Sequence, residues 1–294
     1  MEDPPRELPL RLPYRPPFAA GALLSFLGAR AIPGVEVVRD GTYRRGMRTA
    51  GGGSALISLT PDPMKHLVKL DVSPDRGLDH AALVPDARRA FDLDADSEEI
   101  DAALSRDTDL APSVRRTPGM RVPGTFEAFE LVVRAIFGQQ VSVPGARTLL
   151  GRFAARFGAP LDPPNGDINR VFPSAERVAE ISPDHLEMPR GRAEAIRRVG
   201  ELVASQELNL SDGSSLDETL HTLGEVRGIG PWTLAYVAMR ALRDPDAFLA
   251  GDLGVRKGFE ILGLPSTSRE VLERAERWRP WRAYAVMHLW YAPV

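Results

Sequence analysis

Residues 220–236 read LHTLGEVRGIGPWTLAY, and this stretch decides the fold. A tight turn is predicted where Gly228 and Gly230 flank the single apolar residue Ile229, because glycine allows positive φ and close approach of the backbone. Pro231 suits the first position of a second helix. Apolar residues at helical spacing are Leu216, Leu220 and Leu223 before the turn, and Trp232, Ala235, Tyr236 and Met239 after it. The stretch therefore predicts two helices joined by a hairpin, with Ile229 packed between them.

The start of the second helix is a candidate site for an anion. The first amide groups of a helix have no partner within the helix, and the helix dipole favours negative charge there. In a helix–hairpin–helix the natural ligand is a DNA phosphate. The alternative is an ordinary corner between two helices, but the helices on both sides together with Pro231 favour DNA binding.

The chain before residue 87 has the pattern of antiparallel strands. Asp40-Gly41 is a hairpin-turn dipeptide, and a short apolar helix is expected over 22–27. The predicted strands are residues 35–38, 42–47, 55–59 and 66–72. The expected fold class is α+β, in which an N-terminal antiparallel β-sheet domain with helices precedes a two-part all-α body.

From residue 87 onward the hydrophobic periodicity is helical. The predicted helices include 126–137, 143–157, 190–202, 216–223, 231–242, 253–262, 269–278 and 281–291. We expect three parts: an α+β domain over 1–86, a helical subdomain from 87–124 plus 245–294, and a second helical subdomain over 125–244 that ends in the helix–hairpin–helix. A cleft is expected between the two helical parts.

Composition excludes several kinds of site. The chain of 294 residues has 43% hydrophobic and 26% charged residues, which is typical of a globular protein. It has no cysteine, so disulfides, thiolate nucleophiles and cysteine-ligated metals are excluded. The formal net charge is −3, so any nucleic acid must bind to a local basic surface. No apolar run is long enough for a membrane span, which predicts a cytoplasmic protein.

Three blocks of this sequence resemble one family. Residues 226–233 (VRGIGPWT), with Asp252 22 residues after Gly230, resemble the helix–hairpin–helix (HhH-GPD) DNA glycosylase superfamily. Residues 134–142 (RAIFGQQVS) and 276–291 (ERWRPWRAYAVMHLWY) resemble its AlkA-type 3-methyladenine DNA glycosylase II branch. The resemblance spans nearly the whole chain, and the C-terminal block is its most specific part.

Asp252 is the candidate catalytic residue. From its position before Leu253 its simplest role is to cap a helix N-terminus. The resemblance implies that its carboxylate also faces the sugar of a flipped nucleotide, where it stabilises oxocarbenium charge or orients the attacking water. An alkylated purine such as 3-methyladenine already carries positive charge and leaves without protonation, so no second carboxyl group is required.

The resemblance also implies an aromatic pocket for the flipped base. Trp232, Tyr236 and Trp290 match pocket aromatics of the family, and Phe26 matches one from its first domain. Aromatic walls hold an extruded base by stacking. The alternative for each of these residues is a place in the hydrophobic core, which is the usual fate of tryptophan and tyrosine.

The residues around the hairpin carry further implications of the resemblance. Trp232 stands where glycosylases that also cut the DNA backbone have a lysine nucleophile, so a monofunctional enzyme without lyase activity is expected. No cofactor is required, although the family holds a monovalent cation on backbone carbonyls. The carbonyls that match this structural Na⁺ or K⁺ site belong to Gly224, Val226 and Ile229.

The expected DNA contacts are Gly228, Gly230, Thr233, Gln139 and Gln140. Gln140 departs from the family pattern, because it stands where the AlkA type has a leucine wedge that fills the gap in the DNA. A glutamine buries less apolar surface than leucine, but its amide can form hydrogen bonds with the orphaned partner base. How the gap is filled is therefore open.

The leading hypothesis is a monofunctional DNA glycosylase that removes alkylated bases from double-stranded DNA in base excision repair. Its expected partner is DNA with damaged bases, and we expect a monomer associated with the nucleoid. One alternative is a glycosylase for another damaged purine, such as hypoxanthine or an oxidised base. The other is a helix–hairpin–helix module that binds DNA without catalysis.

Overall fold

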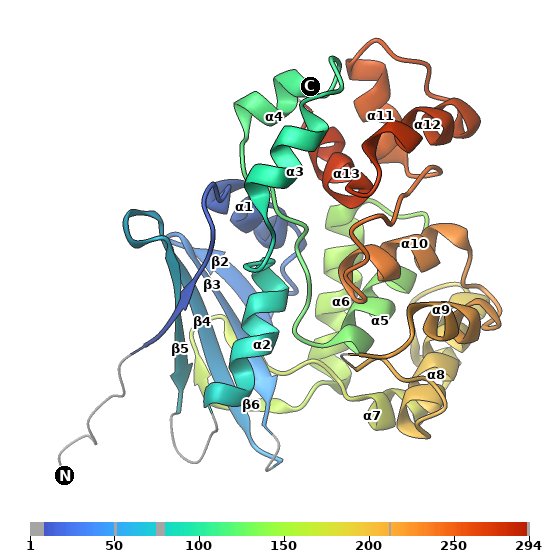
Figure 1. Ribbon diagram of the computed structural model, residues 1–294. Coiled ribbons are helices and arrows are strands. Elements are labelled where there is room, and N and C mark those ends of the chain that lie inside the picture. Colours follow the sequence, from blue (N-terminus) through green and yellow to red (C-terminus); the bar gives the residue numbers. More distant parts are fainter. Residues whose placement is uncertain (1–8, 50–51, 75–79, 212, 293–294) are drawn as a thin grey trace.

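The computed structural model describes residues 9–49, 52–74, 80–211 and 213–292 (Figure 1). Its strands are β1 (Leu10–Pro13), β2 (Glu36–Arg39), β3 (Thr42–Arg48), β4 (Ser54–Asp62), β5 (Leu67–Ser73), β6 (Pro160–Asn165) and β7 (Ile168–Arg170). Its helices are α1 (Ala20–Arg30), α2 (His80–Phe91), α3 (Ser97–Leu104), α4 (Ala111–Arg116), α5 (Ala128–Gly138), α6 (Val143–Phe157), α7 (Ala175–Ala179), α8 (Arg190–Ala204), α9 (Leu216–Gly224), α10 (Pro231–Arg240), α11 (Leu253–Ile261), α12 (Ser268–Ala275) and α13 (Arg282–Trp290). The α+β fold class is confirmed.

The N-terminal sheet is antiparallel, with strand order β1-β5-β4-β3-β2. The hairpin predicted at Asp40-Gly41 is present: both residues have positive φ, 51° and 70°, and Arg39 pairs with Thr42 across the turn. Two positive φ values match the twist of a tight two-residue hairpin. The edge strand β1 is not among the predicted strands, because prolines in and beside it hide the strand pattern.

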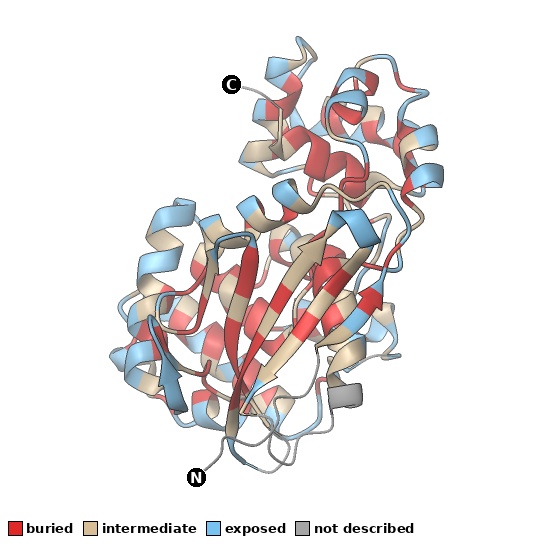
Figure 2. Cartoon of the chain, turned by 90° about the vertical axis from the view of Figure 1, so that its left-hand side faces the viewer, coloured by how far each residue is buried: buried red, intermediate tan, exposed pale blue. Residues whose placement is uncertain are grey.

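Helices α1 and α2 cover one face of this sheet. Leu23 from α1 and Phe91 from α2 are buried in the same hydrophobic cluster as Tyr43, Leu59 and Leu70 from the strands. Figure 2 shows buried stretches interleaved with more exposed ones along the strands of the sheet. The expected boundary after residue 86 falls inside α2, because that amphipathic helix packs as one unit against the sheet.

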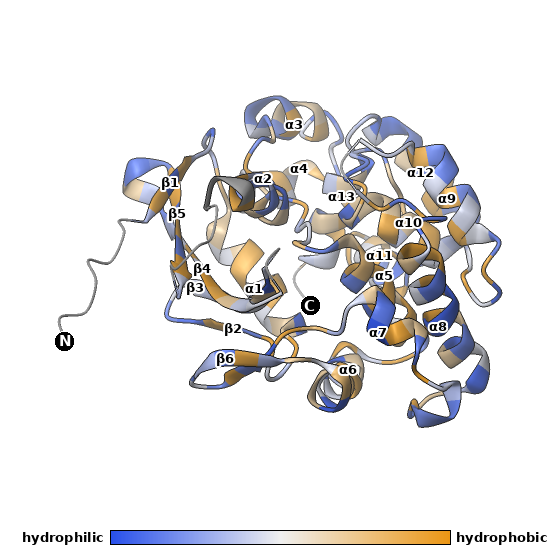
Figure 3. Cartoon of the chain, turned by 90° about the horizontal axis from the view of Figure 1, so that it is seen from below, coloured by the Kyte–Doolittle hydropathy of each residue, from blue (hydrophilic) through white to orange (hydrophobic). Residues whose placement is uncertain are grey.

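Two hydrophobic cores hold the helical body together, and α10 contributes to both. The first core gathers residues of α5, α6, α7, α8 and α9 together with Val237 of α10. The second gathers α3, α4, α11, α12 and α13 together with Ala238 and Met239 of α10. Figure 3 shows hydrophilic stretches along the outer side of α8, consistent with a helix that buries one face. The exact limits of the two helical subdomains stay a prediction.

A buried ion network joins the sheet to α5. The Arg45 guanidinium lies 2.6 Å from one Glu130 oxygen, and their side chains are 2% and 0% exposed. Arg134 pairs with the other Glu130 oxygen at 2.6 Å and with Glu36 of β2, which also accepts a hydrogen bond from the Tyr43 hydroxyl. Burial alone would raise the pKa of Glu130, but Arg45 and Arg134 outweigh burial and lower it. Four charges are thus compensated only when sheet and helix meet in this one arrangement.

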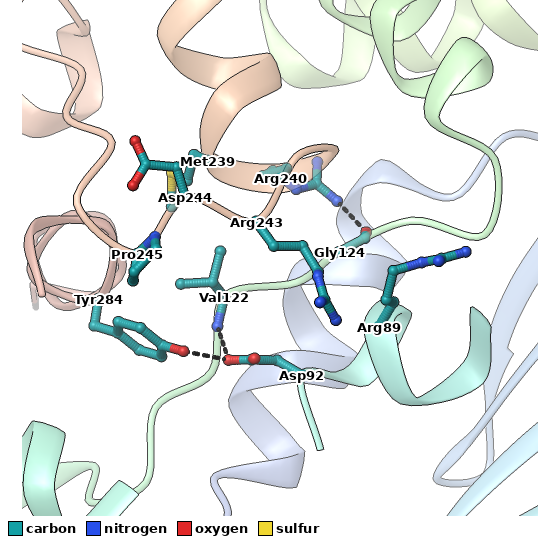
Figure 4. Close-up of a pocket in the computed structure, with 10 residues that line it drawn as sticks. All are labelled: Arg89, Asp92, Val122, Gly124, Met239, Arg240, Arg243, Asp244, Pro245 and Tyr284. Carbon is teal, nitrogen blue, oxygen red and sulfur yellow. Dashed lines mark hydrogen bonds between the residues drawn. The ribbon is translucent and has the colours of Figure 1, made fainter. Parts of the chain in front are cut away.

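A second polar joint lies where α2 ends. Asp92 has a left-handed φ of 51° and accepts hydrogen bonds from the Tyr284 hydroxyl of α13 at 2.9 Å and the Val122 amide at 3.2 Å (Figure 4). A cavity of about 20 Å³, room for about one water molecule, adjoins these groups. Burial raises the pKa of the Asp92 carboxyl to about 6, against the lowering effects of Arg121, Tyr284 and Val122.

None of the helices formed by the described residues combines the length and apolar character needed to cross a lipid bilayer.

Asp92 predicts a specific pH dependence of stability. Because its pKa is higher in the folded than in the unfolded chain, its ionisation opposes folding as pH rises from about 4 to 6. Each pKa unit is worth about 1.4 kcal/mol, so this one group should remove roughly 3 kcal/mol over that range. Urea unfolding of the wild type and Asp92→Asn at pH 4, 5, 6 and 7 measures it. The difference in unfolding free energy between the two proteins should change with pH and then level off; a constant difference would contradict the assignment.

Candidate active site

Asp252 caps α11, as the sequence predicted. Its backbone is extended, and its Oδ1 accepts a hydrogen bond from the Val255 amide at 2.9 Å. The residue is half-buried at the end of the loop that follows α10. Capping fixes the carboxylate at the N-terminus of the helix, where the helix dipole favours negative charge.

Two indoles hold the same carboxylate from the aromatic side. Trp232 of α10 donates its Nε1–H to Asp252 Oδ2 at 2.9 Å, and Trp290 of α13 donates its Nε1–H to Oδ1 at 2.8 Å. Indole N–H groups are donors only, so the carboxylate acts only as an acceptor in this arrangement. Three donors from three chain segments prevent its rotation and leave a fixed negative charge beside the aromatic rings.

Two glycines of α11 allow α13 to approach closely enough for this contact. A Cβ atom on Gly254 would lie 2.8 Å from Trp290 Cδ1 and 3.0 Å from Asp252 Oδ1, and one on Gly258 would lie 2.8 Å from the Leu289 carbonyl oxygen. These distances are shorter than van der Waals contact allows. The two glycines, four residues apart, therefore form a groove that receives the end of α13.

The predicted pocket aromatics lie together, but one of them stands behind the others. Trp232 and Tyr236 are stacked with ring centroids 5.2 Å apart, and Trp290 lies 6.4 Å from Tyr236. Phe26 is 3% exposed and stacks on Trp290 at 5.8 Å. Trp232, Tyr236 and Trp290 line the cleft described next, whereas Phe26 supports Trp290 from the core.

These residues line a cleft of about 950 Å³, which is within the size range of ligand sites. Its walls come from α5, α6 and the turn between them, from α10, from the length of α11 and from the end of α13. Asp252, Gln139 and Gln140 line the same cleft. The tertiary structure thus brings together candidate residues from four separate parts of the sequence.

Two arginines outside the predicted site, Arg30 and Arg240, also line the cleft. Arg240 donates to the Tyr236 hydroxyl and to the carbonyls of Pro123 and Gly124. The Arg30 guanidinium lies 3.7 Å from the centre of the Phe26 ring. Burial alone would raise the pKa of Tyr236, but Arg240 and Arg30 outweigh burial and lower it. Nothing in the sequence near Arg30 or Arg240 signals that both guanidinium groups lie beside Phe26 and Tyr236.

The helix–hairpin–helix has the predicted geometry. Gly228 has a φ of 99°, which favours glycine, and Ile229 is buried in the core between the helices. Gly230 caps α10 through its backbone, and Pro231 is the first residue of that helix. The first amides of α10 therefore have no acceptor within the helix.

Gln139 ties the turn after α5 to the hairpin. Its side-chain amide donates to the Gly228 carbonyl and to the Thr233 hydroxyl, both at 2.9 Å, while Arg192 donates to its backbone carbonyl at 2.6 Å. Thr233 is 2% exposed. Gln139 and Thr233, both predicted to contact DNA, thus form hydrogen bonds within the protein that join the turn after α5 to the hairpin. Gln140 is different, because it is exposed at a left-handed φ of 57° and its side chain is on the rim of the cleft.

The predicted cation ligands can be placed only in part. Within the described residues no three histidine, aspartate or glutamate side chains gather at a metal site. The Val226 carbonyl accepts the Ile229 amide at 3.0 Å, which closes the hairpin turn and leaves that oxygen one lone pair. Carbonyl oxygens suit a hard cation, so the hairpin is compatible with the predicted site, which stays a prediction.

A substitution at Gly254 tests whether the hydrogen bond from Trp290 to Asp252 matters for activity. Gly254→Ala should displace Trp290, break its hydrogen bond to Asp252 and slow the base excision expected for this site by about 10- to 100-fold. Gly251→Ala is the matched control, since a Cβ there meets nothing within 4 Å. Single-turnover excision rates and near-ultraviolet circular dichroism of both variants provide the measurement. Equal rates for the two variants would show that the contact does not matter.

Comparison with known proteins places these features in a family. Residues 9–127 match the AlkA N-terminal domain model, and residues 133–283 match the HhH-GPD superfamily base excision DNA repair protein model. DNA-3-methyladenine glycosylase 2 of Escherichia coli is 34% identical over 283 residues, which cover 95% of this chain and 96% of that protein. The probable bifunctional transcriptional activator/DNA repair enzyme AlkA of Mycobacterium tuberculosis is 43% identical over 96% of this chain, but the chain spans only 56% of that relative's length.

A solved structure shows the same fold. The 3-methyladenine DNA glycosylase from Archaeoglobus fulgidus aligns with a TM-score of 0.83 at 22% identity, covering 96% of this chain and 97% of that one. The likeness extends over the sheet and both helical cores. The chain therefore belongs to the HhH-GPD superfamily of base excision DNA repair proteins and carries an AlkA N-terminal domain.

Proposed function

We propose that this protein is a monofunctional DNA glycosylase that flips alkylated bases of the 3-methyladenine type out of double-stranded DNA and excises them hydrolytically. One observation carries the proposal: the Asp252 carboxylate is fixed between Trp232 and Trp290 at the edge of an aromatic cleft. A module that only binds DNA needs neither a fixed carboxylate nor an aromatic pocket beside it.

The geometry supports different roles for the aromatic rings, which would bind the base, and for the Asp252 carboxylate, which would act on the sugar. A base taken out of the duplex stacks against Trp232, Tyr236 or Trp290, and this stacking offsets the unpairing. The sugar then lies at the mouth, near Asp252. As the glycosidic bond lengthens, positive charge develops on the sugar, and a carboxylate that is already oriented stabilises it without reorganising. The same carboxylate can orient the water that attacks C1′.

The charge of the lesion fits the aromatic part of the cleft. Indole faces attract cations, and a 3-alkylated purine carries positive charge before its bond to the sugar breaks. The departing base becomes neutral on leaving, so no acid has to donate a proton to it. The HhH hairpin would hold a phosphate of the bound strand at the start of α10, with help from a cation on the carbonyls of Gly224, Val226 and Ile229.

Arg30 favours a second group of substrates for the same site. Its guanidinium and that of Arg240 lie beside Tyr236 in the cleft, and guanidinium donors select carbonyl oxygens. Hypoxanthine and 7-methylguanine carry such an oxygen at C6, whereas 3-methyladenine has an amino group there. The two guanidinium groups therefore support excision of hypoxanthine as a second candidate function. They also argue against an enzyme that accepts only cationic adenines.

Base release from a panel of duplexes tests both candidates. The panel contains 3-methyladenine, 7-methylguanine, hypoxanthine and 8-oxoguanine at one position in one sequence. Release of the methylated bases supports the proposal, and no release from any duplex that the protein binds would favour a binding module. The variant Arg30→Ala should lower release of hypoxanthine and 7-methylguanine more than release of 3-methyladenine if the guanidinium contacts the base.

Asp252→Asn tests the catalytic carboxylate. The variant keeps the shape and one oxygen that can cap α11, but its NH₂ group faces the Trp232 Nε1–H and the negative charge is gone. We expect excision to fall by about 10²–10⁴, while affinity for a duplex with an abasic-site analogue changes little. Near-wild-type excision by this variant would refute the assignment.

The monofunctional proposal has its own test. Since Trp232 occupies the hairpin position where a lysine nucleophile would stand, the product should be an intact strand with an abasic site. Borohydride added during turnover should trap no covalent protein–DNA species. Lys257 is the lysine that lines the cleft, so the variant Lys257→Ala serves as the control. A trapped species that Lys257→Ala abolishes would establish lyase chemistry.

A further inference from the structure

The cleft has an apolar rim in addition to its aromatic walls. Among the described residues, the large hydrophobic side chains that are exposed are Met64, Val143, Leu253, Ile261 and Leu272. Val143, Leu253 and Ile261 all line this one cleft, although they come from the start of α6 and from both ends of α11. Single exposed hydrophobic residues are common, but three around one opening indicate an interaction surface.

Leu253 is the most exposed of the three, at 78%. It is the first residue of α11, directly after Asp252, and it lies apart from the face that the helix buries through Val255, Gly258 and Phe259. The fold therefore gives no packing reason for a leucine at this position. Such a side chain gains free energy only when a ligand covers it.

We infer that Leu253 inserts into the base stack of the duplex beside the flipped nucleotide and fills part of the vacated space. This inference rests on the proposed function, because it places the sugar of that nucleotide at Asp252. Leu253 directly follows Asp252, so its side chain then lies beside the gap that the flipped nucleotide leaves in its strand. The surfaces bordering that gap are the faces of neighbouring bases, which are flat and apolar.

A second inserting side chain is needed because Gln140, the other candidate for filling the gap, is polar. Gln140 lines the same cleft from the turn after α5, it is exposed, and its polar amide can pair with the orphaned base. An amide gains little from contact with base faces, whereas an aliphatic wedge is the usual means of holding an unstacked step open. Leu253 supplies the apolar contact, and Gln140 supplies the hydrogen bonds.

A comparison of duplex with single-stranded DNA tests this inference. Single-turnover excision of 7-methylguanine is measured on a matched duplex and on the isolated strand, for the wild type, Leu253→Ala and Leu272→Ala. Leu272 is the matched control, because it is an exposed leucine on α12 that is absent from the cleft lining. We expect Leu253→Ala to lower the ratio of duplex to single-strand rates by about 10- to 100-fold. Leu272→Ala should leave the ratio unchanged.

A second readout does not depend on excision. A duplex with a tetrahydrofuran abasic analogue and an adjacent 2-aminopurine reports unstacking by fluorescence. The wild type and Leu253→Met should raise the fluorescence, and Leu253→Ala should not. Equal loss of excision on duplex and single strand would make Leu253 a wall of the base pocket and overturn the inference, as would an unchanged ratio. No excision by the wild type on either substrate would remove 7-methylguanine from the proposed substrates, while the fluorescence still decides the role of Leu253.

Discussion

The buried charges between the sheet and α5 constrain the rest of the structure. Glu36 and Arg45 come from adjacent strands, and Glu130 and Arg134 come from the helix that ends at the cleft. Breaking any one of these pairs would leave a charge buried without a partner, which costs several kcal/mol. The network therefore allows one register between sheet and helix. Because Arg134 also lines the cleft, this register fixes where the turn with Gln139 and Gln140 stands.

The carboxylate of Asp252, which we propose as catalytic, is held by residues that also form the wall of the cleft. Trp232 and Trp290 serve two purposes, since their faces form the wall of the cleft and their Nε1–H groups hold Asp252. In the proposed function, recognition of a flipped base and placement of the negative charge are thereby linked. A base that displaced either ring would also disturb the carboxylate, so the proposed excision would depend on how the base fits as well as on its reactivity.

The distribution of charge explains how a chain with a formal net charge of −3 fits the proposed DNA partner. Many of its arginines are used inside the protein, as Arg45, Arg134 and Arg240 show. The binding surface proposed for DNA combines helix N-terminal amides, a few basic side chains and an apolar rim. Such a surface depends on local fields and on insertion into the duplex more than on overall charge.

The sequence by itself determined the elements and much of the family. Local patterns were sufficient for the Asp40-Gly41 turn, the strands β2 to β5, the two helices around Gly228 and Gly230, and the cap at Asp252, because each depends on residues close together in the chain. The strand β1 and the hairpin β6–β7 were not predicted, since prolines in β1 and β6 mask the strand pattern and β7 has only three residues. Only the tertiary structure decided that Phe26 stands behind Trp290, that Gln139 and Thr233 bind each other, and that Arg30 reaches the cleft. These outcomes depend on contacts between residues tens to hundreds of positions apart, whose distances are set by how α11 and α13 pack and by how the sheet docks on α5.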